Sequence, residues 1–586
     1  MDLYCYISLA AFCTVVLLTV LVRLRFKKLT LSSGVTAAAA AAVAVLYFGV
    51  FTTEEGSLDL VFRNLVFSII QTVRLFMLDA DDCFLRIYDG LLPSTRVWYS
   101  VFAPCLYFLV PVLTVGFILS LFKNFASYRK LFLHPRKAVF AFSELNERSV
   151  LLAESIRQKK PGALICFARG LDTEEIHSSA LHGRANAVGA LLFKADITEI
   201  NWKLGSSRRP ICFFAISNDP ERCTQEALAL KNNYGKRADA SLLIFSSQMD
   251  SQMLFSVNTD TRMHIRRIDP LRMVVDDNLY THGQLLFRQA IDEGSGEKRI
   301  SAVVLGLGHH GREMVKSLSW FGQMDGYSLD IHVFDRDPQA EERFRDACPE
   351  LMSPAYNGRI TEGDARYHIQ IHTGIQVESP AFRECLRSIG PVSYVLAALG
   401  SDRANIEAAV RLRMLCLQNH CSPLIQSIVY SAEETELLKQ ATDYRGHPYE
   451  IMFIGNLKDI YDWDTLFNNE LQSLALKRHL QWGDEASFWA YEFHYRASVA
   501  SAIHARMRLL CGIPGTGKET PTPEERRGLE LLEHRRWNAY MRSEGYCYSG
   551  SPDPASRSDL AKLHNDLVPF EKLSREEQAK DFVNIF

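Results

Sequence analysis

The sequence lacks the usual marks of metal, redox and nucleic-acid proteins. None of its 13 cysteines forms a C-x-x-C pair or a Cys/His zinc spacing, so we expect scattered small apolar residues in a reducing compartment. The formal net charge of -3 argues against a protein that holds nucleic acid through its phosphates. We therefore expect neither a metal site nor a nucleic-acid partner.

Signatures of other function classes are also missing. The sequence has no TVGYG selectivity filter, so a selective potassium channel is not supported. It has no Tyr-x-x-x-Lys and no evident acid–base pair, which makes an NAD(P)-dependent oxidoreductase the weakest interpretation. No array recurs at a solenoid period. We expect no catalytic residues and no enzymatic activity.

What the N-terminus does have is long apolar runs. Residues 3–22, 34–52 and 98–122 are each apolar over a length that suits a membrane span, with Pro111 inside the third. Basic residues follow the first run, whereas a signal peptide carries them before it, so we expect an anchor that is retained. The 586-residue chain is also too long for one core, and several domains are expected.

A further apolar stretch, residues 58–79, carries two arginines. Charge at mid-bilayer is costly, so this stretch is either a fourth span or an amphipathic helix. The positive-inside rule places the basic clusters after the first and last runs on the same, cytoplasmic side. We therefore predict that residues 1–125 form three spans plus an amphipathic or re-entrant helix, with the N-terminus outside. The acidic loop around Asp81 either attracts cations to a pore mouth or is simply solvated.

The most informative stretch is residues 301–337. An apolar run meets Gly306, Gly308 and Gly311, a helical pattern follows, and a second apolar run ends on Asp335. This order is typical of a Rossmann turn, in which the glycines permit the turn, phosphate approach and helix packing, and the acid takes ribose hydroxyls. The alternative is a Rossmann fold that keeps its glycines for packing alone.

Alternating β and α patterns indicate two doubly wound α/β domains, at 136–290 and 298–480. In the first copy, FSELNE stands where the glycines would lie, and Arg169 follows the second strand in place of an acid. Side chains at those positions block a pyrophosphate. We therefore predict that the first copy is degenerate, and either structural or adapted to another ligand.

The second copy resembles the nucleotide-binding Rossmann domains of Trk-type potassium-uptake regulators and the RCK domains of potassium channels. The resemblance is carried by GLGHHG at 306–311, Asp335, GDA at 363–365 and GSDRANIEAA at 400–409. It implies that the glycine turn holds phosphates, that Asp335 holds ribose and that Asp364 lies near adenine. The implied cofactor is NAD(H) or another adenine nucleotide. Such domains pair face to face, within or between chains, and we expect a homo-oligomer.

Residues 486–586 resemble the RyR domain, which occurs in ryanodine receptors and, alone, in many bacterial proteins. The match rests on EHRRW with GYCYSG and on KLHNDLVPFEKLSREEQAKD, although Tyr546 replaces a usual tryptophan. We expect a mostly α-helical domain that opens with one helix at 486–512. Aromatic and guanidinium groups suit a base and phosphates. The candidate pocket residues are His534, Arg535, Trp537, Tyr546 and Tyr548, with Arg536 beside them; the alternative is that the aromatics are core and the arginines solvated.

Residues 512–518, GIPGTGK, formally fit a phosphate-binding loop. A working loop follows a strand and has Ser or Thr after its lysine. Here a helical pattern precedes the segment, and Glu519 follows Lys518. We therefore predict a flexible linker between helices.

Together, these features predict a bacterial inner-membrane sensor-effector with cytoplasmic Rossmann and RyR domains. A nucleotide-type ligand would bind there and act on the membrane helices, causing ion flux or membrane disruption in stress or antiphage signalling. That last step rests on resemblance. The alternatives are a regulatory subunit that gates a separate potassium or cation transporter and, least supported, an oxidoreductase.

Overall fold

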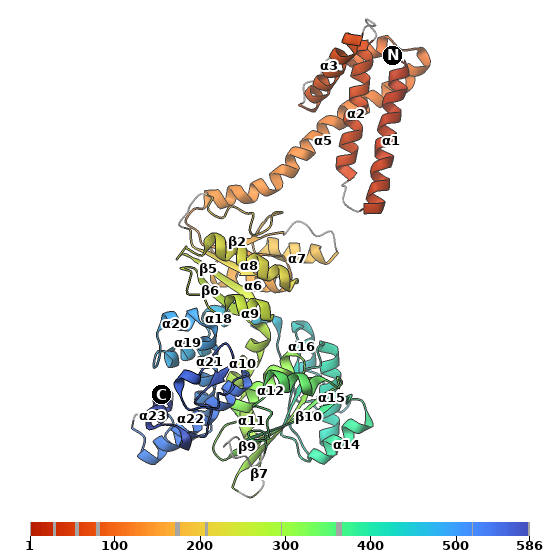
Figure 1. Cartoon of the computed structure of the whole chain (residues 1–586). Helices are drawn as coiled ribbons and strands as arrows, with labels where there is room; N and C mark the ends of the chain where they lie inside the picture. Colours follow the sequence, from red (N-terminus) through yellow and green to blue (C-terminus); the bar gives the residue numbers. More distant parts are fainter. Residues whose placement is uncertain are drawn as a thin grey trace. The chain divides into compact units, whose positions relative to one another are not determined.

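A computed structural model describes residues 2–26, 31–52, 58–77, 83–169, 176–204, 209–292, 294, 296–358, 366–518 and 520–583. The chain divides into two compact units, Met1–Lys130 and Leu131–Phe586. In Figure 1 the first unit runs from red to orange, and the second continues through yellow and green to blue.

The first unit is entirely helical over its described residues. Its helices are α1 (Asp2–Phe26), α2 (Leu31–Thr52), α3 (Leu58–Phe76), α4 (Cys83–Asp89) and α5 (Pro93–Leu133), of which α5 ends in the second unit. Helices α1 and α2 lie side by side (Figure 1), and Ser8 Oγ donates to the Ala42 carbonyl at 2.8 Å. Small and aromatic side chains such as Ala39, Tyr47 and Tyr99 fill the core.

The longest apolar helical stretch of the described residues lies in α5. Among the described residues, one stretch, Pro93–Thr114, is long and apolar enough to cross a bilayer, and Asp2–Leu18 and Ala37–Thr52 are shorter apolar helices. The runs predicted as spans thus lie in α1, α2 and α5. Helix α5 continues past the predicted end at 122 to Leu133, with Pro104 and Pro111 inside it.

Helix α3 has its polar side chains inward and its apolar side chains outward. Asn64, Ser68 and Thr72, four residues apart, are buried, and Asn64 Nδ2 donates to the Phe51 carbonyl of α2 at 2.6 Å. The opposite face is exposed; Phe62, for example, is 70% exposed. The helix predicted at 58–79 is therefore present, with a pattern opposite to that of a water-facing helix.

The second unit begins with a six-stranded parallel sheet in the order β3-β2-β1-β4-β5-β6. Its strands are β1 (Val139–Phe142), β2 (Leu164–Phe167), β3 (Leu191–Leu192), β4 (Ile211–Ala215), β5 (Ala240–Phe245) and β6 (His264–Ile268). Helices α6 (Glu147–Lys159), α7 (Ile176–Ala187), α8 (Pro220–Tyr234) and α9 (Met249–Phe255) connect them. The sequence did not indicate β6, because its HIRRI sequence places two arginines in a short edge strand.

A second sheet repeats this strand order as β10-β9-β8-β11-β12-β13, with β7 antiparallel to β8. Its strands are β7 (Ile291–Asp292), β8 (Lys298–Leu305), β9 (Tyr327–Asp335), β10 (Tyr367–Thr373), β11 (Tyr394–Ala397), β12 (Leu424–Ile428) and β13 (Ile451–Ile454). Its helices are α12 (His309–Phe321), α13 (Ala340–Ala347), α14 (Pro380–Ile389), α15 (Asp402–Gln418) and α16 (Ala432–Lys439). The two strand orders confirm two doubly wound, Rossmann-like sheets.

Short helices join the sheets to each other and to the C-terminal segment. They are α10 (Pro270–His282), α11 (Gln284–Arg288), α17 (Leu457–Ile460) and α18 (Trp463–Phe467). The C-terminal elements are α19 (Glu470–His479), α20 (Glu485–Ala490), α21 (Glu492–Leu510), α22 (Pro523–Ser543), β14 (Cys547–Tyr548), η1 (Pro554–Ser556), β15 (Leu563–His564), η2 (Phe570–Lys572) and α23 (Arg575–Val583).

The single helix predicted at 486–512 is wrong, because the helix breaks at Tyr491. This residue has an extended backbone (φ -116°, ψ 113°) and forms a β-bridge with Val257. The following segment, 512–518, connects α21 to α22 through backbone turns, such as Ile513 N to Arg508 O at 3.0 Å. The structure therefore places a helix, not a strand, before the GIPGTGK segment, as predicted.

The C-terminal helices share a core with the second sheet. The Trp320 ring of α12 meets the Tyr540 ring of α22 edge-on at 6.3 Å. His504 Nε2 lies 2.7 Å from the Gln323 carbonyl, and Cys348 Sγ donates to the Ser543 carbonyl at 3.3 Å. The C-terminal segment is therefore packed as part of the larger unit.

Candidate functional site

The predicted glycine turn and its acid come together at the end of β8. Gly306 N donates to the Phe334 carbonyl at 2.8 Å, and Leu307 N donates to Asp335 Oδ2 at 2.6 Å. Asp335 Oδ1 accepts from Asp337 N at 2.8 Å. Each carboxylate oxygen thus accepts a backbone hydrogen bond from this chain. Asp364, predicted to lie near adenine, falls outside the described residues.

The three glycines of the turn differ in the structural reason for having no side chain. Gly306 has φ +89°, and a Cβ there would lie 2.5 Å from the Ala398 carbonyl oxygen. A Cβ at Gly311 would lie 1.8 Å from the Gly306 carbonyl oxygen. At Gly308, a Cβ would meet no atom within 4 Å, and φ is -67°. Packing therefore accounts for Gly306 and Gly311, whereas Gly308 faces open space at the start of α12.

The beginning of α12 has both neutral and charged neighbours, among them Asp335, which accepts from Leu307 N. Gly308 is its N-cap and provides no side-chain cap. His310 Nε2 lies 3.0 Å from Tyr430 Oη, and burial lowers the pKa of His310 to about 4. The free N–H groups of the first turn would attract an anion.

The corresponding turn of the first copy contains a carboxylate of its own. Glu144 Oε2 accepts from Ser217 Oγ at 2.5 Å and from Asn218 N at 3.4 Å, at the end of β4. After β2, Arg169 pairs with Glu226 and lies 3.2 Å from Asp196. These internal pairs fit a copy that does not hold a pyrophosphate.

A cavity of about 630 Å³ lies in the C-terminal segment. Helices α19, α21, α22 and α23 and the stretch around β15 contribute its walls. It is lined by Arg478, Gln481, Trp482, Phe493, His494, Ala497, Ser498, Ser501, Glu533, His534, Arg536, Trp537, Met541, Arg557, His564, Asp566, Leu573, Glu577 and Lys580. Its volume lies in the range of sites for nucleotide-sized molecules.

Aromatic rings form two parts of the cavity wall. His534 and Trp537 stack with centroids 5.9 Å apart, and His564 meets Trp537 edge-on at 4.9 Å. On α19 and α21, Trp482 meets His494 edge-on at 5.1 Å, and Trp482 is 48% exposed. Flat apolar faces of this kind suit a heteroaromatic ring.

Two of the cavity histidines, His494 and His564, have lowered pKa values. Burial, followed by the Arg557 guanidinium, lowers the pKa of His564 to about 4. Burial also lowers the pKa of His494. The carboxyl of Asp566 shifts the other way, since burial and then Glu577 raise its pKa.

A buried charge cluster lies at the cavity wall. It is here called the Glu533 cluster and consists of four lining residues, Arg478, Ser501, Glu533 and Arg536, and of Arg508 behind them. Arg536 donates to Glu533 at 2.9 and 3.1 Å, and Arg508 Nη1 lies 3.4 Å from Glu533. Arg478 Nε donates to Ser501 Oγ at 2.9 Å. Burial opposes ionisation of Glu533, but Arg536 and Arg508 outweigh it and lower its pKa to about 2.

Two of the five predicted pocket residues, His534 and Trp537, line this cavity. The other three do not line it, and their side chains or backbone make contacts elsewhere. Arg535 pairs with Asp325 at 2.9 Å, Tyr546 Oη reaches Asp559 at 3.4 Å, and Tyr548 N donates to Glu350 at 2.6 Å. Neighbouring residues on a helix point in different directions, so Arg535 contacts the loop between α12 and β9, whereas Arg536 lines the cavity.

Other residues that line the cavity were not predicted from the sequence. Ala497, Ser498 and Ser501 are small side chains on one face of α21, and that spacing is a signal for a close approach or a hollow. Arg478 carried no such signal, because it lies in a helix that looked like the end of the second Rossmann domain. Among the described residues, no three His, Cys, Asp or Glu side chains gather as metal ligands.

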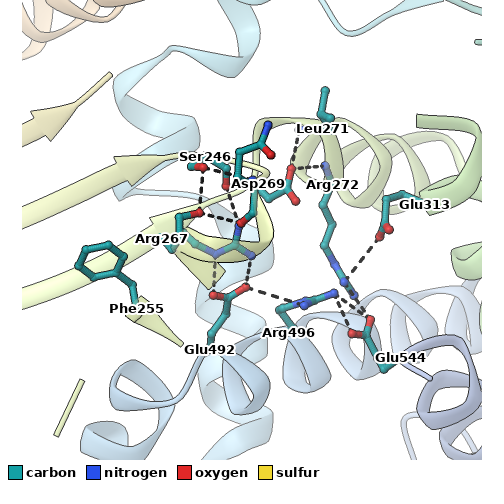
Figure 2. Close-up of polar contacts among 12 residues, drawn as sticks. Ser246, Phe255, Arg267, Asp269, Leu271, Arg272, Glu313, Glu492, Arg496 and Glu544 are labelled. Carbon is teal, nitrogen blue, oxygen red and sulfur yellow. Dashed lines mark hydrogen bonds and ion pairs between the residues drawn. The ribbon is translucent and has the colours of Figure 1, made fainter. Parts of the chain in front are cut away.

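A network of ion pairs connects α21 to the first sheet (Figure 2). Arg267 of β6 makes two bonds to Glu492, at 2.8 and 2.5 Å. Arg272 of α10 and Arg496 of α21 each lie 2.9 Å from Glu544. Burial opposes the charge of Arg272, yet its carboxylate neighbours, Glu544 first, raise its pKa well above the usual value.

Comparisons with known proteins add little to this description. No family model and no curated protein matches the chain. Among solved structures, a dipicolinate synthase polypeptide from Bacillus halodurans is similar at 10% identity and a TM-score of 0.20, over 56% of this chain and 93% of that one. A likeness at that level carries no argument, and the Rossmann-like assignment rests on the strand orders of this chain.

Proposed function

We propose that this chain is a membrane-anchored sensor-effector whose nucleotide-type ligand binds in the C-terminal cavity. Binding there acts on the N-terminal helices and causes ion flux or membrane disruption. The observation that carries the proposal is the cavity of about 630 Å³, because it combines stacked aromatic rings with buried guanidinium groups. An adenine nucleotide, whose base is flat and whose phosphates are anionic, matches both.

Helix α21 supplies a route from the cavity to the first sheet. His494, Ser498 and Ser501 of this helix line the cavity. Glu492 and Arg496 of the same helix hold the ion pairs to β6 and to Glu544. A ligand that favours one position of α21 would therefore change these ion pairs. Tenfold preference for one state corresponds to about 1.4 kcal/mol of coupling.

The first sheet is in turn joined to the apolar helices through the chain. Helix α5 ends at Leu133 and β1 begins at Val139, so a linker of residues 134–138 connects them, and Arg209 donates to the Leu131 carbonyl of α5 at 2.6 Å. A change in the first sheet thus has a short covalent path to α5. The Rossmann-like sheets would serve as the element between sensor and effector.

The membrane part of the proposal is supported by the first unit. The exposed apolar face of α3 and its buried polar stripe suit a helix whose surroundings are lipid. The stretch Pro93–Thr114 has the length and apolarity of a span. The setting in bacterial stress or antiphage defence, and assembly into a homo-oligomer, rest on the resemblance to other proteins alone.

Dye release from liposomes tests this function. The full chain is reconstituted into vesicles loaded with a self-quenching dye, and NAD, ATP, ADP and AMP are added separately. We expect at least one of them to cause release, and Trp537→Ala to abolish that response. Binding of a nucleotide in the same vesicles without any release would contradict the effector role.

A further inference from the structure

One part of the cavity wall contains a half-exposed tryptophan. Trp482 follows the end of α19, lines the cavity and is 48% exposed. Trp537, in the other aromatic part of the wall, already packs against the rings of His534 and His564. An indole that is half exposed in a cavity wall provides apolar area for a flat occupant. The Trp482 side of the cavity is therefore the better place for a heteroaromatic base.

The residue before Trp482 has a buried amide oxygen that accepts no hydrogen bond. Gln481 lines the cavity, and its buried Oε1 has no hydrogen-bond partner among the described residues. Buried acceptors in folded proteins are nearly always paired, because an unpaired one costs free energy. The Gln481 oxygen in the cavity wall therefore marks a place for a donor that the chain itself does not supply.

A second unpaired atom lies in the same part of the wall. The His494 ring meets Trp482 edge-on at 5.1 Å, and its buried Nδ1 likewise has no hydrogen-bond partner in the described part of the chain. Burial lowers the pKa of His494 more than the backbone of Ser487 raises it, so the imidazole is neutral at pH 7. A neutral imidazole with its proton on Nε2 has an acceptor at Nδ1. Gln481 and His494 thus place two acceptors beside one half-exposed indole.

A neutral donor suits this place better than a cation does. The carboxylates that line the cavity, Glu533, Asp566 and Glu577, each accept from or pair with another residue. An ammonium group would therefore find no unpaired carboxylate among the described lining residues, whereas a neutral amino group needs only acceptors. An amino group on a heteroaromatic ring lies in the plane of the ring. It can donate sideways to two acceptors while the face of the ring lies against Trp482.

On the basis of the proposed function, we infer that the base of the ligand lies against Trp482 and that its exocyclic amino group donates to Gln481 Oε1 and His494 Nδ1. Adenine fits, because its 6-amino group has two N–H donors. Hypoxanthine has a carbonyl oxygen at the same position, and this oxygen would meet the two acceptors of the protein. The cavity should therefore select adenine over hypoxanthine.

Two substitutions separate the contact with the edge of the base from the contact with its face. Gln481→Met removes an acceptor, so it should weaken binding of adenine ligands alone and reduce their preference over hypoxanthine ligands to about twofold. Trp482→Leu keeps an apolar side chain but loses the indole. Because stacking does not distinguish bases, this variant should weaken both kinds of ligand, by about fivefold or more, and keep the preference.

Titration calorimetry of the full chain in detergent, with ADP and IDP as a pair, tests this inference. The two nucleotides differ in the amino or carbonyl group at position 6 of the base. The wild type should bind ADP about tenfold more tightly than IDP, or better. Gln472→Met is the matched control for Gln481→Met, since Gln472 lies in α19 and does not line the cavity. It should leave the preference unchanged.

The outcomes separate recognition of the base from the wider function. Equal affinity for ADP and IDP, or a full preference that survives in Gln481→Met, would overturn the place of the base while the nucleotide ligand stands. Adenosine bound in preference to inosine, without binding of ADP, ATP or NAD, would support the place of the base and refute the proposed nucleotide ligand. A wild type that binds none of these nucleosides and nucleotides would overturn both.

Discussion

Single residues show why a glycine motif alone does not define a ligand site. Gly306 and Gly311 are required by the backbone itself, through a positive φ in one case and a close carbonyl in both. Gly308 is the one that the folded chain does not require. A substitution at Gly308 therefore tests whether a ligand approaches the backbone there, without disturbing the packing of the fold.

Substitution by alanine should distinguish these glycines. Gly311→Ala places a Cβ 1.8 Å from a backbone oxygen, so we expect a loss of at least about 2 kcal/mol in the free energy of unfolding. Gly308→Ala meets no atom and should stay within about 1 kcal/mol. Denaturant unfolding of the full chain in detergent measures both. Equal losses would show that the open space at Gly308 is absent in solution.

Buried histidines should make the fold sensitive to mild acid. Burial lowers the pKa of His310, His332 and His564 to about 4. Between pH 6.5 and 4 the unfolded chain therefore binds more protons at these groups, and stability falls as the pH falls. Burial raises the pKa of Asp276, to about 7, and of Asp566, which opposes this trend, but burial lowers the pKa of further histidines as well, among them His494 and His504.

Denaturant unfolding at pH 7 and pH 5 measures this pH dependence. We expect the free energy of unfolding to be lower at pH 5. In histidine NMR spectra at pH 5, at least three imidazoles, those of His310, His332 and His564, should still be mostly neutral. A stability that rises on acidification would contradict these assignments.

The sequence predicted some of these residues and not others. The G-x-G-x-x-G spacing and a strand ending in Asp335 follow from local rules, and the structure brings them together. His534 and Trp537 came from a resemblance. Arg478, by contrast, reaches the cavity from a helix distant in sequence, and only the packing of α19 on α21 places it there.

At the scale of elements, α21 contributes to two features at once, because it supplies residues to both the cavity and the ion-pair network. The network joins β6 and α10 to the C-terminal helices through paired charges. Such pairs are strongly directional, so a small shift of α21 changes them more than it would change an apolar contact.

A double-mutant cycle on Arg267 and Glu492 tests the strength of this link. Each single change, Arg267→Met or Glu492→Gln, breaks a largely buried pair, although Glu492 also lies 3.8 Å from Arg496, and should cost about 3 kcal/mol. The double variant should cost clearly less than the sum. Additive losses, measured by unfolding, would show that the pair does not couple α21 to β6.

The exposed apolar face of α3 predicts that this helix contacts lipid. If lipid covers its outer face, a tryptophan at Phe62 should be quenched by lipids brominated on the acyl chain, since Phe62 is 70% exposed. Leu560→Trp is the matched control, because Leu560 is 99% exposed and lies in the second unit. Equal quenching at the two positions, or none at Phe62, would contradict a lipid-facing α3.

Element boundaries followed the sequence where periodicity was strong and failed where tertiary contacts decided. The two sheets were predictable because apolar β runs alternate with helical patterns. The break at Tyr491 was not, because the bridge to Val257 that causes it joins residues far apart in the sequence. The edge strand β6 was not recognised because it contains two arginines, Arg266 and Arg267, whose partners Tyr495 and Glu492 lie in the C-terminal segment.

At the scale of the whole molecule, contacts within the Leu131–Phe586 unit connect the cavity to the first sheet through α21. The cavity is built on α19, α21 and α22, the ion pairs lead from α21 to the first sheet, and that sheet follows α5 in the chain. Coupling of this kind needs a ligand that prefers one arrangement of these elements. The central claim is therefore that a nucleotide-type ligand occupies the C-terminal cavity.

Mass spectrometry of small molecules released from the purified full chain tests that claim most directly. We expect the wild type to release a nucleotide, the double variant Gln481→Met/Trp482→Leu to release little or none, and Gly308→Ala to release as much as the wild type. A wild type that releases no nucleotide, or a nucleotide that the double variant retains and Gly308→Ala loses, would contradict the claim.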